Sequence, residues 1–305
     1  MKTEVDHTDM SDPIFHSGEE FIQEQSGEKG MAIRNRGIIS NQLSPGAATF
    51  LINQKIFFTS SMDADGFLWA SVLSGADGFL KFDESQQLDC DTTFLTSNPQ
   101  ELFWNNIIHM PGVGLLFIDL INRRRLRING SFSGHNDLWQ IKIKQAYPNC
   151  PKYIQRRDLL NSTGKFKAVS HEIENWVSMA DTIFVASADL NGNLDVSHRG
   201  GNKGFVKYLD ENTLRIPDYL GNSMFNTLGN FHINPSAGIL ILDFNTGDTL
   251  QLTGKATVHL NEENKDVFTG GTKRFWDFKI EKTLFSKSLS NFSSRFIDFS
   301  PYNPQ

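Results

Sequence analysis

Short apolar runs separated by polar turns recur along the chain, and this pattern is typical of β-strands. Two of them, "KIFFTSS" and "TIFVASA", each lead through a turn rich in Asp, Asn and Gly into a second strand-like stretch, "LWASVLS" or "LDVSHR". Each such pair predicts a β-hairpin. "GLLFIDL" and "GILILDF" have the continuous apolar character of buried strands, whereas "RLRINGSF" and "LQLTGKATV" alternate by twos. Many short strands with Gly-containing turns favour small antiparallel barrels.

Helical patterns are fewer and short. They are "GEEFIQEQSG", "NPQELFWNNIIH", "CPKYIQRRDLL" and "HEIENWVSMAD", the second of which begins with an Asn-Pro signal. The sequence therefore predicts a mainly β protein, built from β-barrels with short helices, of the α+β class.

The chain contains nearly the same segment twice. Residues 57–82 and 183–208, aligned without a gap, are identical at ten of 26 positions, where ordinary amino-acid usage would give about one or two. Two further blocks repeat in the same order, "PGVGLLFIDLINRRRLRING" beside "PSAGILILDFNTGDTLQLTG" and "WQIKI" beside "WDFKI". Three repeated blocks in one order predict two copies of one domain.

The boundary between the copies is expected near residue 162, within "NSTGKFK". This gives an N-terminal domain of residues 1–162 and a C-terminal domain of residues 163–305. The helix "HEIENWVSMAD" is expected to begin the second copy as "GEEFIQEQSG" begins the first. A chain of 305 residues is long enough for two hydrophobic cores.

Composition narrows the class of protein. Hydrophobic residues make up 39% and charged residues 21%, as in folded globular proteins. The net charge of −6 argues against general affinity for nucleic acid, and no apolar run reaches the roughly 18 residues of a membrane span. The start is polar and has no signal-peptide pattern, and Cys90 and Cys150 make neither a disulfide framework nor a metal site. A reducing cytoplasm is therefore the expected location.

The order of motifs in both copies resembles the FMN-binding split barrel of the pyridoxamine 5'-phosphate oxidase family. The second copy carries "DVSHRGG", "GFV", "LRIPD" and "GN", and the first carries "LWASVLSG", "GFL", "RLRING" and "NCPKYIQRR". The last run is associated with the oxidase-like branch that has two barrels per chain. Family members usually pair two barrels as a dimer and bind FMN in the groove between them. The resemblance therefore implies two tandem FMN-binding split barrels that form a pseudo-dimer, with one or two flavin sites that have become unequal.

The strand "DVSHRGG" is the first candidate for holding the FMN phosphate. Period-2 alternation places Asp195, Ser197 and Arg199 on one face, and Gly200 follows with a second glycine that leaves backbone N–H groups accessible. A hydroxyl, a guanidinium and free N–H groups suit a phosphate. An exposed hairpin with a surface arginine is the alternative, and the pattern alone does not separate the two.

The loop "YLGNSMFNT" is the second candidate. Family members often have an Arg close after its Gly-Asn pair, and here Met224 stands instead. Asn222 and Ser223 would therefore contribute only neutral hydrogen bonds. From the first copy, "NCPKYIQRR" adds the cation Lys152, at the start of a predicted helix whose N-terminus could bind an anion.

In the first copy the positive charge has moved to another strand. Ser71 matches the serine of "DVSHRGG", but Leu73 stands where that strand has its arginine, and the adjacent Trp69 is either a stacking partner for an isoalloxazine ring or a core residue. Arg125 and Arg127, in "RRRLRING", share one face of a predicted strand, while the second copy has Thr and Gln at their places. A groove between the barrels could collect the arginines of both copies. A charged, solvated edge strand is the other interpretation for the first two arginines of this run.

The resemblance implies an FMN-binding flavoprotein, and an oxidoreductase that takes a small-molecule substrate or electron donor and whose flavin accepts a hydride or electrons at N5. F420 and haem are alternative ligands for the same scaffold. The competing hypothesis is a non-catalytic binding or interaction protein that kept the barrels and lost the cofactor, which Met224 and Leu73 favour. Pairing of two barrels in one chain predicts a monomeric pseudo-dimer or a homodimer, with no nucleic-acid, membrane or metal partner.

Overall fold

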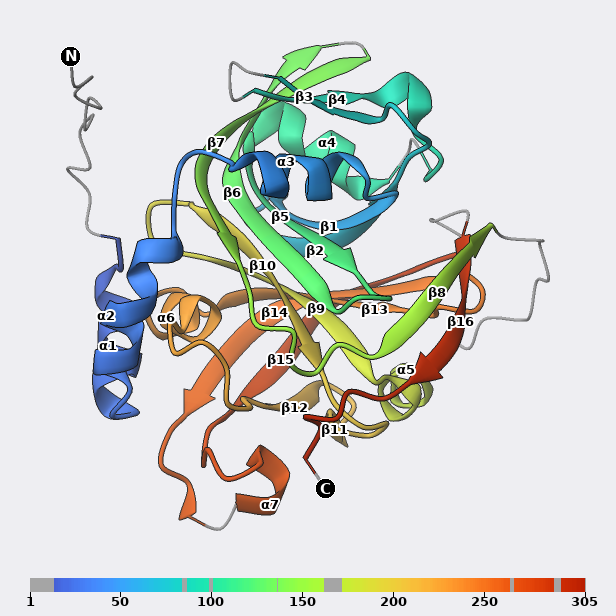
Figure 1. Cartoon of the computed structure of the whole chain (residues 1–305). Coiled ribbons are helices and arrows are strands. Elements are labelled where there is room, and N and C mark those ends of the chain that lie inside the picture. Colours follow the sequence, from blue (N-terminus) through green and yellow to red (C-terminus); the bar gives the residue numbers. More distant parts are fainter. Residues whose placement is uncertain are drawn as a thin grey trace, which may run out of the picture.

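Two seven-stranded antiparallel sheets form the body of the molecule, one from each half of the chain (Figure 1). The structure, a computed structural model, describes residues 14–83, 87–98, 101–135, 137–161, 172–263, 266–287 and 292–304. The first sheet has the order β2-β1-β5-β6-β7-β4-β3 and consists of β1 (Ile56–Met62), β2 (Leu68–Ser74), β3 (Leu80–Phe82), β4 (Leu88–Asp91), β5 (Gly112–Asp119), β6 (Arg124–His135) and β7 (Leu138–Pro148). The second has the order β10-β9-β13-β14-β15-β12-β11 and consists of β9 (Thr182–Ala188), β10 (Leu194–Gly200), β11 (Lys207–Asp210), β12 (Thr213–Pro217), β13 (Ser236–Leu242), β14 (Thr249–His259) and β15 (Phe275–Ser286).

The two sheets have one topology and one register. Each strand of the second sheet occupies the place of the strand eight numbers earlier in the first. Leu116 pairs with Arg127 between β5 and β6, and Leu240 pairs with Gln251 at the equivalent point between β13 and β14. The prediction of a mainly β, α+β fold made of two tandem split barrels in a pseudo-dimer is confirmed.

Even an irregularity of the sheets is repeated. The register shifts at Gly130 in β6 and at Gly254 in β14. A Cβ atom at Gly130 would lie 2.1 Å from the carbonyl oxygen of Lys142, and one at Gly254 would lie 2.0 Å from that of Lys279. Each bulge therefore needs glycine because another strand approaches the backbone too closely for any side chain.

Each barrel has its own hydrophobic core, and a third core joins the barrels. In this third core the equivalent residues Phe58 and Phe184 stack on each other, with ring centroids 3.3 Å apart. Gly114 of β5 lies against the backbone of Asp195 in β10, and Gly238 of β13 makes the equivalent approach to β2. Equivalent residues meeting each other are what a pseudo-two-fold axis between the barrels produces.

Short helices fill the same places in both repeats. α3 (Pro45–Ile52) and α5 (Ile173–Met179) precede β1 and β9, and α4 (Leu102–His109) and α6 (Asn226–Ile233) precede β5 and β13. The remaining helical elements are α2 (Lys29–Asn35), α7 (Asp266–Thr269) and the 3-10 turns Arg36–Ile38 and Thr92–Phe94. Helices were predicted at α4 and α5, and both are present.

The helix "GEEFIQEQSG" forms, as α1 (Ser17–Gln25), but it does not begin the first barrel. It packs on α6 of the second barrel, and α3 takes the place equivalent to α5 (Figure 1). The two helices cross where both have glycine, since a Cβ at Gly18 would lie 2.2 Å from the carbonyl oxygen of Gly229. The expectation that α1 and α5 are equivalent is therefore wrong.

The run "CPKYIQRRDLL" is not a helix, contrary to the prediction. Its end forms β8 (Arg156–Asn161), which pairs with the C-terminal strand β16 (Phe292–Asp298) in a two-stranded sheet. The side chain of Gln155 fixes the segment before β8, because its Oε1 accepts hydrogen bonds from the backbone N–H of Ser300 (2.7 Å) and from Asn303 Nδ2 (3.2 Å). These contacts with the end of the chain override the local helical preference.

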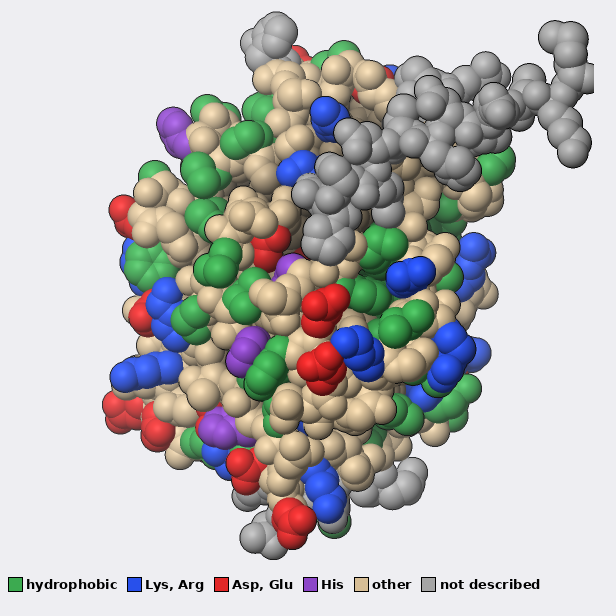
Figure 2. All heavy atoms as spheres, turned by 90° about the vertical axis from the view of Figure 1, so that its left-hand side faces the viewer, with side chains coloured by type: hydrophobic (Ala, Val, Ile, Leu, Met, Phe, Trp, Pro, Cys, Tyr) green, Lys and Arg blue, Asp and Glu red, His purple; other side chains and the backbone are tan. Residues whose placement is uncertain are grey.

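The predicted domain boundary near residue 162 lies outside the described residues, so its position stays a prediction. Among the described helices none is long and apolar enough to cross a membrane. On the face that carries α1 and α2, acidic and basic side chains are interspersed and neither sign dominates (Figure 2).

Candidate functional site

A solvent-open pocket lies between the two barrels. The first barrel contributes β6 and the segment 149–153, and the second contributes β10 and the loop between β12 and α6. Among the lining residues four side chains are basic, Arg125, Arg127, Lys152 and Arg199, whereas Asp218 alone is acidic. The excess of positive charge in the lining indicates an anionic ligand.

Arg127 has its charge balanced inside the protein. Its Nη1 lies 3.2 Å from Asp195 Oδ2 and donates to the hydroxyl of Tyr147 at 3.2 Å. Asn129 Nδ2 also donates to the Asp195 carboxylate, at 3.3 Å. Because Arg127 and Asp195 are both buried, each depends on the other for a counter-charge.

Arg125, two residues earlier on the same face of β6, has no carboxylate partner among the described residues. Its Nη1 donates to Nδ1 of His198 at 3.2 Å, and its Nε has no hydrogen-bond partner. Desolvation, together with the charges of Arg127 and Arg199, lowers the pKa of Arg125 to about 9. An anion bound in the pocket would therefore stabilise the charged guanidinium of Arg125.

His198 is the second unsatisfied group. Desolvation and the neighbouring arginines, Arg125 first among them, hold the pKa of His198 well below its ordinary value, so the imidazole is neutral. Since Nδ1 accepts from Arg125, the single ring proton is on Nε2. This buried Nε2–H has no acceptor among the described residues, and His198 is one of the residues that line the pocket.

Arg199 belongs to a chain of alternating charges that fixes one wall of the pocket. Its Nη1 lies 2.5 Å from Asp218 Oδ1, and Asp218 Oδ2 lies 3.1 Å from Arg274 Nε. Arg274 in turn contacts Glu28 at 2.7 Å, and Glu28 accepts a hydrogen bond from the hydroxyl of Ser223 at 2.5 Å. The chain holds Arg199 and Ser223 in place at the pocket.

Strained backbone gathers at the pocket. Tyr153, Ser223 and Phe225 all line it and all have positive φ angles, of 67°, 62° and 62°. Phe225 is the N-cap of α6 and provides no side-chain hydrogen bond to the first turn. Thr227 in that turn donates to the hydroxyl of Ser197 at 2.9 Å. Backbone strain is commonly concentrated at binding sites, and the first turn of α6, which has no side-chain cap, borders the same pocket as the arginines.

Comparison with known protein families gives a match for the second half of the chain. The sequence profile of the pyridoxamine 5'-phosphate oxidase family matches residues 169–288. Those residues carry β9 to β15, the strands that form the second barrel and half of the pocket. We call these matched residues, 169–288, the oxidase-family domain. No curated protein sequence matches the chain.

Solved structures similar to this chain each cover about two fifths of it. A Clostridium acetobutylicum protein of the pyridoxinephosphate oxidase family, related to general stress protein 26, is 14% identical, with a TM-score of 0.31 over 41% of this chain and 92% of its own. An FMN-binding protein from Syntrophomonas wolfei is 12% identical, with a TM-score of 0.31 over 38% and 84%. HutZ, the haem storage protein of Vibrio cholerae, is 13% identical, with a TM-score of 0.29 over 38% and 92%.

Most of the residues singled out in the sequence lie together in the pocket between the oxidase-family domain and the first barrel. The lining includes Ser197, Arg199, Gly200, Asn222, Ser223, Arg125, Arg127 and Lys152. The strand of Arg199 is largely buried, so the alternative of an exposed hairpin is wrong. Whether these residues bind a cofactor stays a prediction.

Gly200 and Met224 are explained by packing. A Cβ at Gly200 would lie 2.1 Å from the carbonyl oxygen of Tyr153, so glycine lets segment 149–153 approach β10 and close the pocket. The side chain of Met224 is fully buried in a small cluster with Phe15 and Tyr147 and does not line the pocket. This position therefore supplies no ligand contact in the oxidase-family domain.

Trp69 and Ser71 do not line this pocket. Trp69 is largely buried, and its Nε1–H donates to Asp63 Oδ2 at 2.9 Å across the β1–β2 turn. Ser71 is fully buried and accepts a hydrogen bond from Gln251 Nε2 at 3.0 Å. Both residues belong to β2 of the first barrel, and Ser71 contacts Gln251 of the second barrel.

The N-terminal strap, residues 16–35, holds the pocket loop of the oxidase-family domain. Asn35 Nδ2 donates to the carbonyl of Asn222 at 2.8 Å, and Gln23 Nε2 donates to that of Met224 at 3.1 Å. Asn226 Nδ2 donates to Glu19 Oε1 at 2.5 Å. Together with the Glu28 contact to Ser223, three strap residues hold the loop between β12 and α6, and a fourth holds Asn226 at the start of α6. The sequence contained no signal for these contacts.

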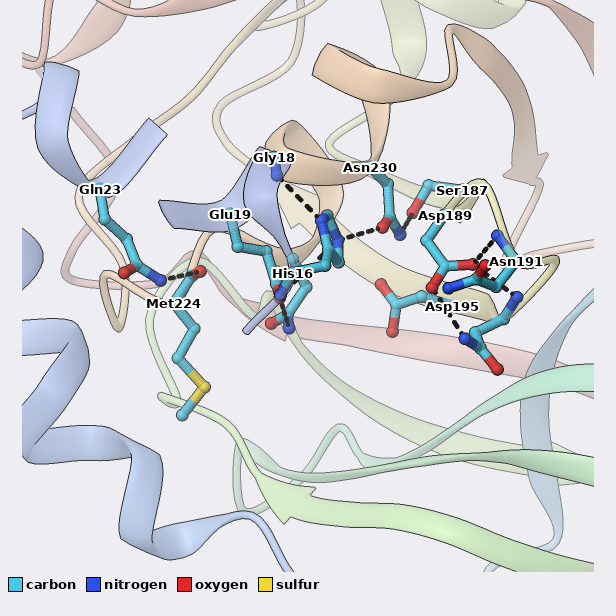
Figure 3. Close-up of polar contacts among 12 residues, drawn as sticks. His16, Gly18, Glu19, Gln23, Ser187, Asp189, Asn191, Asp195, Met224 and Asn230 are labelled. Atoms are coloured by element: carbon cyan, nitrogen blue, oxygen red, sulfur yellow. Dashed lines mark hydrogen bonds and ion pairs between the residues drawn. The ribbon is translucent and has the colours of Figure 1, made fainter. Parts of the chain in front are cut away.

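His16 and Glu19 form the buried end of the strap (Figure 3). Nδ1 of His16 accepts from the N–H of Gly18 at 3.1 Å, so its Nε2–H donates to Asn230 Oδ1 at 2.9 Å. Burial, opposed by hydrogen bonds and reinforced by Asp195 and Asp189 nearby, raises the pKa of Glu19 to about 8. The carboxyl of Glu19 therefore keeps its proton up to a higher pH than an ordinary glutamate, because it is buried and close to two carboxylates.

Proposed function

We propose that the pocket between the barrels binds the phosphate of FMN and that the chain is an FMN-binding flavoprotein. The observation that carries this proposal is Arg125, a cation without a carboxylate partner among the described residues, which shares the pocket with the unpartnered Nε2–H of His198. A dianionic phosphate would satisfy both groups. Such charge-assisted hydrogen bonds are about twice as strong as neutral ones.

The other groups fit the same ligand. Ser197 and the uncapped first turn of α6 offer a hydroxyl and backbone N–H groups, and Lys152 adds a further cation at the rim. Aromatic rings of Tyr153 and Tyr219, with centroids 5.2 Å apart and planes tilted by 46°, stand in the same lining and offer apolar contacts to a ring system. The lining thus combines polar groups that suit a phosphate with aromatic groups that suit a ring system.

An oxidoreductase activity is the finer part of the proposal. Bound FMN supplies a centre that accepts a hydride or electrons. In this chain the residues of the pocket would bind and orient it, whereas Asp218, held by Arg199 and Arg274, is not free to act as a base. A small-molecule donor is therefore expected to reduce the flavin directly. Anaerobic bleaching of the flavin absorbance by candidate donors tests this step.

The binding itself is tested by adding FMN to the purified protein and removing the excess. Retained FMN, identified by its absorbance and released by heat, supports the proposal, and Arg199→Ala is expected to lose retention. A colourless protein that takes up no FMN would favour a non-catalytic binding protein instead. Absorbance of F420 or haem would assign another ligand to the scaffold.

Cys150 offers a second readout, because it lines the pocket and is partly exposed while Cys90 is fully buried. Labelling with iodoacetamide should therefore report on this pocket. FMN or inorganic phosphate is expected to slow the labelling of Cys150, and equal labelling rates with and without either anion would contradict the proposed site.

The proton position on His198 bears on the haem alternative. Nε2 of His198 carries the proton because Arg125 donates to Nδ1, so Nε2 has no free lone pair for an iron ion. An anion that accepts from Nε2 fits this arrangement without any change of tautomer.

A further inference from the structure

The pseudo-two-fold axis requires a counterpart of the pocket, made by β2, α4 and β14. At this place Ser71 is equivalent to Ser197 and Gln251 to Arg127, as the matching registers show. The structure places a protein carboxylate there. Glu101, the N-cap of α4, is only 2% exposed and its side chain enters this space.

Three donors surround the Glu101 carboxylate. The backbone N–H of Phe103 donates to Oε2 at 2.5 Å, and Gln251 Nε2 donates to Oε1 at 3.2 Å. The hydroxyl of Ser71, which accepts from Gln251 Nε2 at 3.0 Å, acts on the same carboxyl and lowers its pKa. Burial raises the pKa of Glu101, and these three hydrogen bonds oppose that shift because they favour the ionised carboxylate.

The open pocket has equivalents of the three donors but not of the acceptor. The N–H of Thr227, the hydroxyl of Ser197 and the guanidinium of Arg127 take the places of the donors around Glu101. Phe225 stands where Glu101 stands in the first repeat, and its side chain makes no cap hydrogen bond. One site therefore has its donors around the carboxylate of Glu101. In the other, Arg127 pairs with Asp195 through Nη1 but its Nε has no partner, and the donors border the open pocket.

We infer that the Glu101 carboxylate is an intramolecular replacement for a ligand's anionic group, and that it closes the second of two pseudo-symmetric sites. The chain then takes up one anionic ligand, not two. The number of ligands rests on the function proposed above, whereas the role of Glu101 does not. Removal of the carboxylate is expected to leave a buried oxyanion site that accepts a small carboxylate such as formate.

The experiment is thermal unfolding of Glu101→Ala in increasing sodium formate, with sodium chloride at the same ionic strength as the reference. Truncation leaves buried donors unsatisfied, so the midpoint should fall. Formate should raise the midpoint by several degrees more in this variant than in the unmodified protein, whose open pocket can also bind an anion. Asn106→Ala is the matched control, since Asn106 is a buried polar residue of the same helix that donates to Ser61 at 2.9 Å. Formate should not restore it.

Equal effects of formate on Glu101→Ala and Asn106→Ala, or an unchanged midpoint in Glu101→Ala, would overturn the inference. If Glu101→Ala does not fold in chloride, its recovery as soluble protein when refolded in formate is the expected result, and failure in both salts while Glu101→Gln folds counts against it. Titration of the unmodified protein with FMN gives the number of sites. One FMN per chain agrees with the inference and two contradict it, whereas no binding contradicts the proposed function and leaves the formate result to decide the role of Glu101.

Discussion

The two sides of the pseudo-two-fold axis have the same strands, the same registers and different contents. Where the open pocket has Arg127 and Phe225, the closed counterpart has Gln251 and Glu101. The difference teaches that a duplicated backbone does not preserve a duplicated site. A few side chains decide whether donors around a helix N-terminus bind a ligand or a carboxylate of the protein itself.

The helices next to the two sites, α6 and α4, also differ in one side chain at an equivalent position. α6 has Gly229 where α1 crosses it, and the equivalent position of α4 is the exposed Asn105. Because the crossing leaves no room for a Cβ, the N-terminal strap can dock on α6 but not on α4. The strap thus braces only the open pocket.

The largest effect is expected from making the open pocket resemble its counterpart at Arg127. Arg127→Gln leaves the buried Asp195 without its counter-charge, which typically costs about 3–5 kcal/mol of unfolding free energy. The free energy of unfolding in urea, compared between the variant and the unmodified protein, measures this cost. The double variant Arg127→Gln with Asp195→Asn should recover most of the loss, and a cost below about 1 kcal/mol for the single variant would contradict the pairing.

The next effect concerns the strap, which only the open side has. Glu19 has a pKa of about 8 in the folded chain and about 4.3 in an unfolded one, so the folded state binds more protons between these values. The unfolding free energy should therefore fall as pH rises, by up to about 1.4 kcal/mol per pH unit. His16, whose pKa burial lowers, acts in the opposite direction below its ordinary value, so the window is pH 6.5 to 8.

Unfolding of Glu19→Gln at several pH values is the measurement for this effect. The decline between pH 6.5 and 8 should become flatter than in the unmodified protein. Glu20→Gln, an exposed neighbour on the same helix, is the control and should keep the decline. A Glu19→Gln variant with the full decline would assign the pH dependence to other groups.

A smaller effect is expected when Arg125 takes the residue of its counterpart. Arg125→Thr removes a charged donor from the pocket but breaks no ion pair among the described residues, so FMN and phosphate should bind roughly tenfold to a hundredfold more weakly with little change in stability. Competition with Cys150 labelling measures the affinities. Arg124→Ala, an exposed neighbour on β6, should bind normally, and equal affinities of the two variants would place the phosphate elsewhere.

The smallest effect is expected from the strap contact at Glu28. Glu28→Gln keeps the shape but weakens the charged contacts to Arg274 and Ser223, so the pocket loop should be held less firmly. We expect about a fivefold loss of FMN affinity. The loss should come mainly from faster dissociation of FMN, and the association rate should change less. Glu24→Gln, an exposed strap residue paired with Lys29, is the control. Identical dissociation rates for Glu28→Gln and Glu24→Gln would mean that the strap contact at Glu28 does not influence FMN binding.

Much of this protein was determined by its sequence alone. Alternating and continuous apolar runs define strands because side-chain direction has a period of two, and the repeated glycines at Gly130 and Gly254 are local steric requirements. The same local information grouped Arg125, Arg127, Ser197 and Arg199 as candidates, since duplicated strands imply equivalent faces.

Only the tertiary structure decided which of these residues meet. The pairing of Arg127 with Asp195, the entry of Glu101 beside Gln251 and the pairing of β8 with β16 each join segments far apart in the chain. Contacts of this kind leave no periodic or local signal, because they depend on how the two barrels pack around their common axis. For the same physical reason Trp69 and Ser71 matched a binding motif in sequence yet lie outside the open pocket.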